Sequence, residues 1–229
     1  MKQYISHDLS VLRDSLDFKS KTPFEKLDLQ KGVIIRKRDL TSDCFGGDHS
    51  YNILSWPSKT DLRQHILLTY NPDQDGFGEI CGFNEEPFLK IKRLNRCECT
   101  FACFGRPEYD IIYEGEGTKQ IVGRISCPFK FSSIKMTVTG NGHLERWNHT
   151  YVIKGKYSEL GLCCTRAKES LFFDIEDENQ EIYHSERWFD KSESSDADDY
   201  FVEFPARATP EQKALILAGC LVLNHRILG

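Results

Sequence analysis

Two aspartates near the carboxyl end of the chain have the spacing of the first ligands of a calcium loop. Asp196 and Asp198 occupy positions 1 and 3 of such a loop in the segment Ser195-Asp-Ala-Asp-Asp-Tyr200. Calcium takes six to eight oxygen ligands, and a loop site ends on a bidentate carboxylate at position 12. Arg207 stands at that position here, so the segment predicts a weak calcium site. The alternative is a solvated acidic loop that leads into a buried strand.

A second segment imitates the start of an EF-hand. Residues 71–79 read Asn-Pro-Asp-Gln-Asp-Gly-Phe-Gly-Glu and place Gly76 at position 6. Pro72 lies inside this loop, Gly82 takes position 12, and both flanks have the composition of strands. A β-hairpin that turns on Asp75-Gly76 therefore explains the segment better than a calcium site.

The chain has nine cysteines, an odd number, and three of them, Cys97, Cys99 and Cys103, lie close together. Zinc sites are usually built on Cys-x-x-Cys pairs, which this sequence lacks, and the nearest histidines are far away in sequence. The first residues contain no apolar signal-peptide core, so we expect reduced thiols in an intracellular protein and not disulfides.

No motif for bond chemistry is present. The sequence lacks Gly-x-Ser-x-Gly, a phosphate loop, His-Glu-x-x-His, and Gly-x-Gly-x-x-Gly after a strand. The net charge of −5 provides no broad positive field for nucleic acid. We therefore expect neither an enzyme nor a nucleic-acid-binding protein.

The elements that would position these residues are mostly strands. Residues 1–28 are polar and lack a clean hydrophobic period, which predicts a loosely attached arm with one or two helical turns at most. From Gly32 onward short β-type runs alternate with turn residues, and Ile134, Met136 and Val138 alternate with polar neighbours. The predicted strands are 33–36, 51–55, 65–70, 88–94, 100–104, 109–114, 120–126, 134–139, 151–154, 171–175, 181–183 and 200–204. So many short antiparallel strands favour a closed barrel, because closure removes exposed edges.

The chain ends in a different pattern. Thr209-Pro210-Glu211-Gln212 has the residues of a capping box with proline at the first helical position, and ten uninterrupted apolar residues follow from Ala214 to Leu223. Ten residues of helix cover about 15 Å, half of a hydrocarbon core of about 30 Å. A helix that is apolar on every side is buried on every side. The sequence therefore predicts a barrel domain over residues 29–229 with a central helix at 210–226.

These segments resemble the phospholipid scramblase family. The Asp-Ala-Asp-Asp-aromatic segment from Ser195 to Pro205, followed by the apolar helix with Gly219 and Cys220, is similar to the family's carboxyl-terminal signature. The segment 96–103 lies where the family has a cysteine-rich cluster, and residues 121–125, 127–128 and 163–164 follow in the family's order. The resemblance covers about residues 30–229 and is strongest over 96–223.

This resemblance implies a tubby-like barrel and calcium-responsive movement of phospholipids between membrane leaflets, or binding of membrane phospholipids and proteins. It also implies a calcium ion at Asp196 and Asp198, acylation of Cys97, Cys99 and Cys103, and peripheral attachment to the cytoplasmic side of a membrane. The family's long proline-rich amino-terminal segment is absent, and its cysteine cluster is thinned to three. A buried structural role for the three thiols remains the alternative to acylation. A tubby-like interaction module that moves no lipid remains the alternative function.

Overall fold

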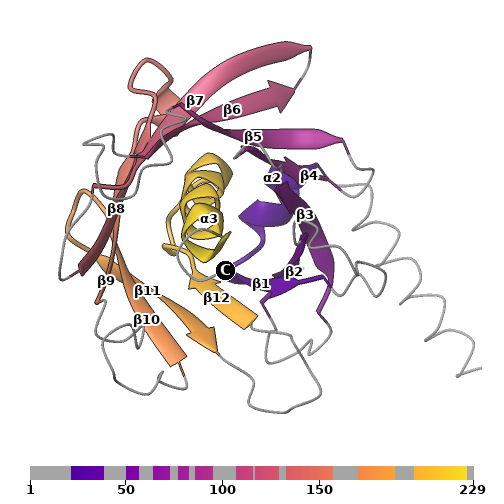
Figure 1. Ribbon diagram of the computed structural model, residues 1–229. Coiled ribbons are helices and arrows are strands. Elements are labelled where there is room, and N and C mark those ends of the chain that lie inside the picture. Colours follow the sequence, from indigo (N-terminus) through magenta and orange to yellow (C-terminus); the bar gives the residue numbers. More distant parts are fainter. Residues whose placement is uncertain are drawn as a thin grey trace, which may run out of the picture.

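The computed structural model describes residues 22–38, 50–56, 64–72, 77–82, 86–94, 107–115, 117–128, 133–156, 170–188 and 199–225. These residues confirm the predicted fold class: twelve antiparallel strands form a closed barrel around one carboxyl-terminal helix (Figure 1). The strands are β1 (Gly32–Lys37), β2 (Tyr51–Ser55), β3 (Ile66–Pro72), β4 (Phe77–Cys81), β5 (Pro87–Arg93), β6 (Glu108–Gly115), β7 (Thr118–Ser126), β8 (Ser133–Gly140), β9 (Thr150–Lys156), β10 (Ser170–Glu176), β11 (Ile182–Trp188) and β12 (Asp199–Glu203). The helices are α2 (Pro23–Asp28), the short 3-10 helix η1 (Glu145–Trp147) and α3 (Pro210–Leu223).

One strand differs from the sequence prediction. The structure places β4 at Phe77–Cys81, a run with a glycine and a glutamate that did not have the composition of a strand. It pairs with β3 so that Asn71 faces Glu79 and Pro72 faces Gly78, which confirms a hairpin over the segment that imitates an EF-hand. The strand predicted at residues 100–104 lies outside the described residues.

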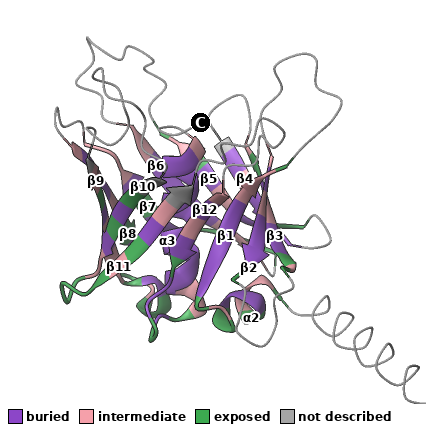
Figure 2. Cartoon of the chain, turned by 90° about the horizontal axis from the view of Figure 1, so that it is seen from below, coloured by how far each residue is buried: buried purple, intermediate pink, exposed green. Residues whose placement is uncertain are grey.

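The two ends of the barrel are different. Helix α2 lies at the end where α3 begins, which is here termed the base, and α3 ends at the opposite end, termed the mouth (Figure 2). Strand β1 starts near α2 and runs toward the mouth, and each following strand reverses direction. Every odd-numbered strand therefore ends at the mouth, and the even-numbered strand that follows it begins there.

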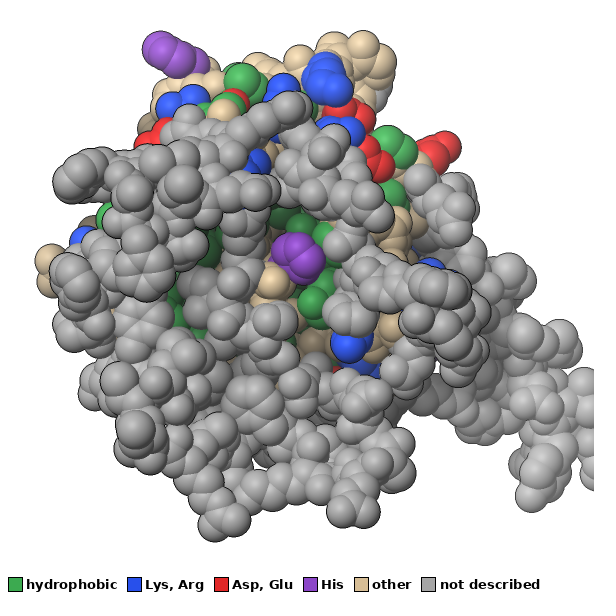
Figure 3. Space-filling view, in the orientation of Figure 1, with side chains coloured by type: hydrophobic (Ala, Val, Ile, Leu, Met, Phe, Trp, Pro, Cys, Tyr) green, Lys and Arg blue, Asp and Glu red, His purple; other side chains and the backbone are tan. Residues whose placement is uncertain are grey.

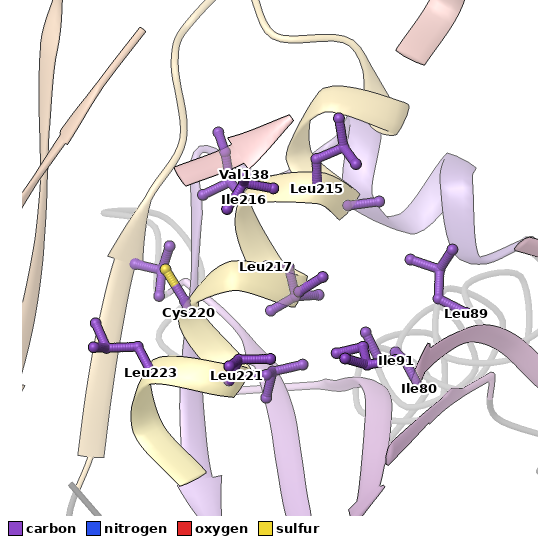
Figure 4. Packing of buried hydrophobic residues seen from close by; sticks show 14 of the residues in the cluster. Ile80, Leu89, Ile91, Val138, Leu215, Ile216, Leu217, Cys220, Leu221 and Leu223 are labelled. Atoms are coloured by element: carbon purple, nitrogen blue, oxygen red, sulfur yellow. The ribbon is translucent and has the colours of Figure 1, made fainter. Parts of the chain in front are cut away.

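Helix α3 fills the barrel. From Ala214 to Leu223, each side chain in α3 is at most 3% exposed, and the barrel wall packs residues such as Ile80, Leu89 and Ile91 toward it (Figure 4). Burial of this many apolar side chains stabilises the fold by a gross 15–25 kcal/mol or so. The predicted capping box is present, because Thr209 accepts from the Gln212 amide and the Gln212 side chain accepts from the Thr209 amide. None of the helices in the described ranges has the length and apolarity needed to cross a bilayer.

Helix α2 is held at the base by a buried lysine. Lys213, in the first turns of α3, donates through Nζ to the backbone oxygens of Leu27 (3.2 Å), Asp28 (2.8 Å) and Gln30 (2.9 Å). These oxygens lie at the end of α2 and just after it, where carbonyls are outside the helical hydrogen-bond ladder, and Leu27 O also accepts from the Gln30 amide. Leu27 is fully buried, and the Phe24 ring lies 4.8 Å from Phe88 between ring centroids. Residues 22–28 of the segment predicted as an arm are thus packed against the base.

Gly219 provides the first prediction, because it marks the closest approach of α3 to the wall. A Cβ at this position would lie 2.6 Å from Val138 Cγ2 and 3.1 Å from Ile153 Cδ1. Gly219→Ala should therefore lower the free energy of unfolding by about 1–3 kcal/mol through overpacking, although alanine is favoured in a helix by about 1 kcal/mol. Urea unfolding measures the change, and adding Val138→Ala should restore part of the loss.

Gly142→Ala is the matched control, because a Cβ there meets only Asn148 Oδ1 at 3.5 Å. It should change stability by less than about 0.5 kcal/mol. A Gly219→Ala protein as stable as its parent would show that α3 does not pack tightly against β8.

Candidate functional site

The segments that carried the sequence-based site predictions are joined to strand ends at the mouth. Strand β11 ends there at Trp188 and β12 begins there at Asp199, and β5 and β6 have their ends at Arg93 and Glu108 at the same side. The predicted calcium ligands Asp196 and Asp198, and the predicted acylation sites Cys97, Cys99 and Cys103, lie outside the described residues. Both predictions thus stay predictions.

Asp199, the last aspartate of the acidic motif, forms an ion pair between the first and the last strand of the barrel. It lies opposite Arg36 in the β1–β12 register, and its two carboxylate oxygens each accept from the guanidinium at 2.6 Å. The hydrogen bond to Asp199 is also the main reason that the pKa of Arg36 is raised. Since both oxygens are engaged by Arg36, a calcium site on this motif would use the carboxylates before Asp199. The parts of the chain that the structure describes contain no group of three or more metal-binding side chains.

Aromatic rings surround the last described residue of the helical segment at the mouth. The His225 ring lies 6.5 Å from Tyr51 and 6.4 Å from Tyr70, edge to face with each, between ring centroids. Figure 3 looks onto the mouth and shows a histidine beside hydrophobic side chains near the middle of this face. Tyr51 and Tyr70 are buried, so these rings form the end of the core that lies nearest the mouth, here termed the aromatic floor.

Below this floor, buried hydrogen bonds between side chains link the barrel wall to α3. Ser185 Oγ and Tyr200 Oη are 2.8 Å apart, and Tyr200 also hydrogen-bonds the thiol of Cys220. Burial raises the pKa of Cys220 to about 12, and the contact with Tyr200 offsets this only in part. Cys81, Cys127 and Cys220 are the free thiols within the described ranges. Cys220 at neutral pH is an un-ionised core residue and not a nucleophile.

One candidate ligand site among the described residues is a groove on the outer wall, here termed the lateral groove. It has a volume of about 200 Å³ and runs over β2 and β3 from the end of β1 near the mouth to the end of β4 near the base. Its lining combines the cation Arg38 with three side chains that can form hydrogen bonds, Asn52, Thr69 and Asn71. The floor is made by Ile66, Leu67, Leu68 and Gly82.

The groove arises from strand alternation. Asn52 lies directly opposite Thr69 in the β2–β3 register, so both polar side chains point out of the barrel, while Ile53 and Leu68 form the next pair toward the core. Asn71 follows Thr69 by two residues on the same face. Arg38 follows β1, and its backbone amide donates to the Ser50 carbonyl, which fixes the start of its side chain beside β2. Four polar groups from three chain segments are thus brought to one surface.

Several outward cations on the barrel wall are paired with carboxylates. Lys90 pairs with Glu79, Arg124 with Asp110 and Lys154 with Glu176, each across neighbouring strands. Arg38 is exposed, and no carboxylate among the described residues pairs with it. An exposed guanidinium beside amide and hydroxyl donors is a good site for an anion such as a phosphate, because the guanidinium can donate two parallel hydrogen bonds.

The lateral groove has no signature in the sequence. Asn52, Thr69 and Asn71 are ordinary outward positions of two strands, and their convergence depends on the pairing register and on a bulge between Ile53 and Leu54. Alternation of polar and apolar residues in 51–55 and 65–70 was the only available signal, and it gives the face of a residue but not its neighbours across the sheet.

The buried thiol provides a prediction about pH. The native chain keeps the Cys220 proton up to about pH 12, whereas the unfolded chain releases it near its ordinary pKa of 9.0. The stabilisation from this proton is present below pH 9 and is lost as the pH rises toward 12, by about 1.4 kcal/mol per pH unit. Relative to the parent, Cys220→Ala should therefore gain about 2 kcal/mol of stability between pH 9 and pH 10.5. Urea unfolding at several pH values tests this, and a difference that does not change with pH would contradict it.

Comparison with known proteins leaves the family open. No family model matches this chain, and no solved structure matches it. The resemblance to the scramblase family therefore stays a prediction from the residues that carry it.

Proposed function

We propose that this protein binds anionic phospholipid headgroups at a membrane surface through the lateral groove. The observation that carries the proposal is the exposed Arg38 guanidinium beside Asn52, Thr69 and Asn71, with no carboxylate opposite it in the described part of the chain. A phosphodiester carries one negative charge and accepts hydrogen bonds from guanidinium, amide and hydroxyl groups. These four side chains offer that set of donors.

The dimensions of the groove support a headgroup as the ligand. Its volume of about 200 Å³ is below the 300–1,000 Å³ typical of pockets that enclose a whole drug-sized molecule. A phosphate and its substituent fit such a space while the acyl chains stay in the membrane. Ile66, which is 45% exposed at the base side of the groove, offers apolar contact for the part of the lipid next to the phosphate.

Lipid movement between leaflets is the additional step that the scramblase resemblance implies. In this proposal the lateral groove shelters the polar headgroup while Asp196 and Asp198 bind calcium and make the movement calcium-dependent. No bond is made or broken, so the protein acts as a lipid carrier or binder and not as an enzyme.

A second candidate is an interaction module that moves no lipid. Neighbouring residues are paired across β10, β11, β12 and β1: Phe172 faces Glu186, Glu186 faces Phe201, and Phe201 faces Ile34, which is only 1% exposed. Phe172 is 53% exposed and Trp56 is 39% exposed, with the Trp56 and Phe201 ring centroids 5.6 Å apart. Exposed aromatic side chains of this kind are enriched in protein–protein interfaces.

Vesicle binding tests the lipid proposal. The parent protein should co-float with vesicles that contain anionic phospholipid, and Arg38→Gln should weaken binding by about tenfold or more, because a hydrogen bond to a charged group contributes about 1.5–3 kcal/mol. Arg207→Gln is the matched control, since Arg207 is an exposed arginine at the base, outside the groove. Equal binding by parent and Arg38→Gln would exclude the groove as the lipid site.

The same vesicles test lipid movement. A labelled phospholipid reports exchange between leaflets with calcium or with a chelator. Calcium-dependent exchange above that of empty vesicles, lost in Asp196→Ala, supports the scramblase activity. If the protein binds the vesicles without exchanging lipid, it is a headgroup-binding protein. If it neither binds nor exchanges lipid, the interaction module remains.

A further inference from the structure

The outward carboxylate of Glu186 has an aromatic neighbour across the sheet on each side. Strand β11 lies between β10 and β12 (Figure 1), and Glu186 faces Phe172 on β10 and Phe201 on β12. By contrast, Glu79 and Asp110 each face the cation with which they pair. Glu186 has no ion pair within the described part of the chain. A half-buried negative charge thus lies between two rings without a cation from the described strands.

The spacing of the two rings suits one cation. Neighbouring strands lie about 4.8 Å apart, so outward side chains on β10 and β12 start roughly 10 Å from each other, with Glu186 midway between them. An aromatic ring attracts a cation that lies within about 6 Å of the ring centroid. A cation placed above Glu186 is therefore within reach of both rings and of the carboxylate. Phe172, which is 53% exposed, leaves this position accessible from solvent.

Trp56 supports the Phe201 ring from the side of β1. The two ring centroids lie 5.6 Å apart, in an edge-to-face arrangement. The Trp56 ring lies over β1 at Gly32, where a Cβ would come within 2.9 Å of Trp56 Cε3. Glycine at this position therefore lets Trp56 reach Phe201 across β1. The contact limits how far the Phe201 ring can lean away from Glu186.

Further carboxylates lie next to this row of side chains. Asp174 and Glu203 are the next outward residues of β10 and β12 toward the base, two positions after the aromatic ones. Asp174 Oδ1 lies 3.2 Å from His184 Nδ1, and Lys154, which faces Asp174 from β9, pairs with Glu176. Glu203 has no ion pair among the described residues. The resulting negative potential favours a cation at the row.

The geometry of the row selects the kind of cation. A flat guanidinium stacks on a ring at about 3.5–4 Å, so it contacts only one of two rings that start roughly 10 Å apart. A quaternary ammonium group is rounded, presents methyl groups in every direction, and is recognised in proteins by several aromatic rings at once. Strand β11 pairs with both of its neighbours at this row, so a peptide that carries methylated lysine finds no backbone hydrogen bonds here. A choline group therefore fits better than a peptide.

From these observations we infer that Phe172, Glu186 and Phe201 bind a quaternary ammonium group of the choline type. The two rings contact the methyl groups, the Glu186 carboxylate balances the positive charge, and Trp56 positions the Phe201 ring. Such a group occurs both in lipid headgroups and in soluble phosphocholine. The inference is separate from the proposed function, because these residues are not among those that line the lateral groove.

NMR of the full chain labelled at phenylalanine tests the site with choline chloride, which carries no phosphate. The ring signals of Phe172 and Phe201 should shift saturably, with a Kd on the order of 1–10 mM. Glu186→Gln should weaken binding by about tenfold, because it removes the counter-charge. The neutral isostere of choline, in which carbon replaces the charged nitrogen, should bind at least about tenfold more weakly than choline. No saturable shift with choline, or equal binding of the neutral isostere, would overturn the inference.

Two matched variants separate the site from the overall charge and from the fold. Glu178→Gln makes the same charge change in the exposed turn between β10 and β11 and should bind choline as the parent does. Phe172→Leu should weaken binding by about threefold or more, whereas Phe172→Tyr keeps a ring and should retain it. The Phe201 signal reports on both variants. Equal losses in Glu178→Gln and Glu186→Gln would mean that choline responds to net charge alone, and the site would be wrong.

Further arms identify the source of the choline group. If the ligand is a lipid headgroup, the parent should co-float with vesicles of phosphatidylcholine alone, and Phe172→Leu should do so less. If the ligand is soluble, phosphocholine should shift the ring signals while these vesicles do not bind. Both results support the site. A trimethyl-lysine peptide that binds about tenfold more tightly than phosphocholine would overturn the choline assignment.

Vesicles of phosphatidylglycerol separate this inference from the proposed function, because this anionic lipid contains no choline. If the protein does not bind these vesicles but responds to choline chloride, the lateral groove is rejected as a lipid site and the choline site stands. If the protein binds them through Arg38 but gives no response to choline chloride, the proposed function stands and the choline site is wrong.

Discussion

The helix α3 cannot be exposed to water on any side, and the barrel is the arrangement that meets this constraint. A sheet that covered only one face of α3 would leave the other faces exposed, whereas twelve strands closed on themselves surround it completely. Smaller barrels are filled by their own side chains, so the presence of the helix also sets a lower limit on the number of strands. Gly123, Gly140 and Gly219 follow from the same constraint, since a Cβ at each would come within 3.0 Å of another atom between wall and helix.

Polar side chains reinforce the barrel at two places, the β1–β12 pairing that closes it and the base. Arg36 and Asp199 join the first and the last strand through two hydrogen bonds, and Lys213 joins the first turns of α3 to the carbonyl end of α2. Burial lowers the pKa of Lys213, because the charged ammonium group loses its hydration inside the protein. Three carbonyl oxygens offset that loss. The Lys213 ammonium group is thus kept inside by backbone acceptors at the base.

Local pattern was enough to predict most of this architecture. The capping box at Thr209 and the ten apolar residues after it gave the central helix, and alternation gave most strands. Strand β4 was missed because Gly78 and Glu79 lower its strand propensity, while its place in the sheet is determined by pairing with β3 and β5. The lateral groove was missed for a related reason. Its residues come from separate strands, and only the register brings Asn52 and Thr69 together.

The order of the elements along the chain has a consequence for synthesis in the cell. The helix that fills the barrel is made after every described strand, and β12, the strand that pairs with β1, immediately precedes it. All twelve strands are therefore synthesised before the apolar helix that they must cover, and β1 pairs with a strand about 165 residues away in sequence. Contacts so distant slow folding and leave apolar strands exposed meanwhile. The nascent chain should thus depend on chaperones until α3 has been made, and a truncation that removes α3 should send it to degradation.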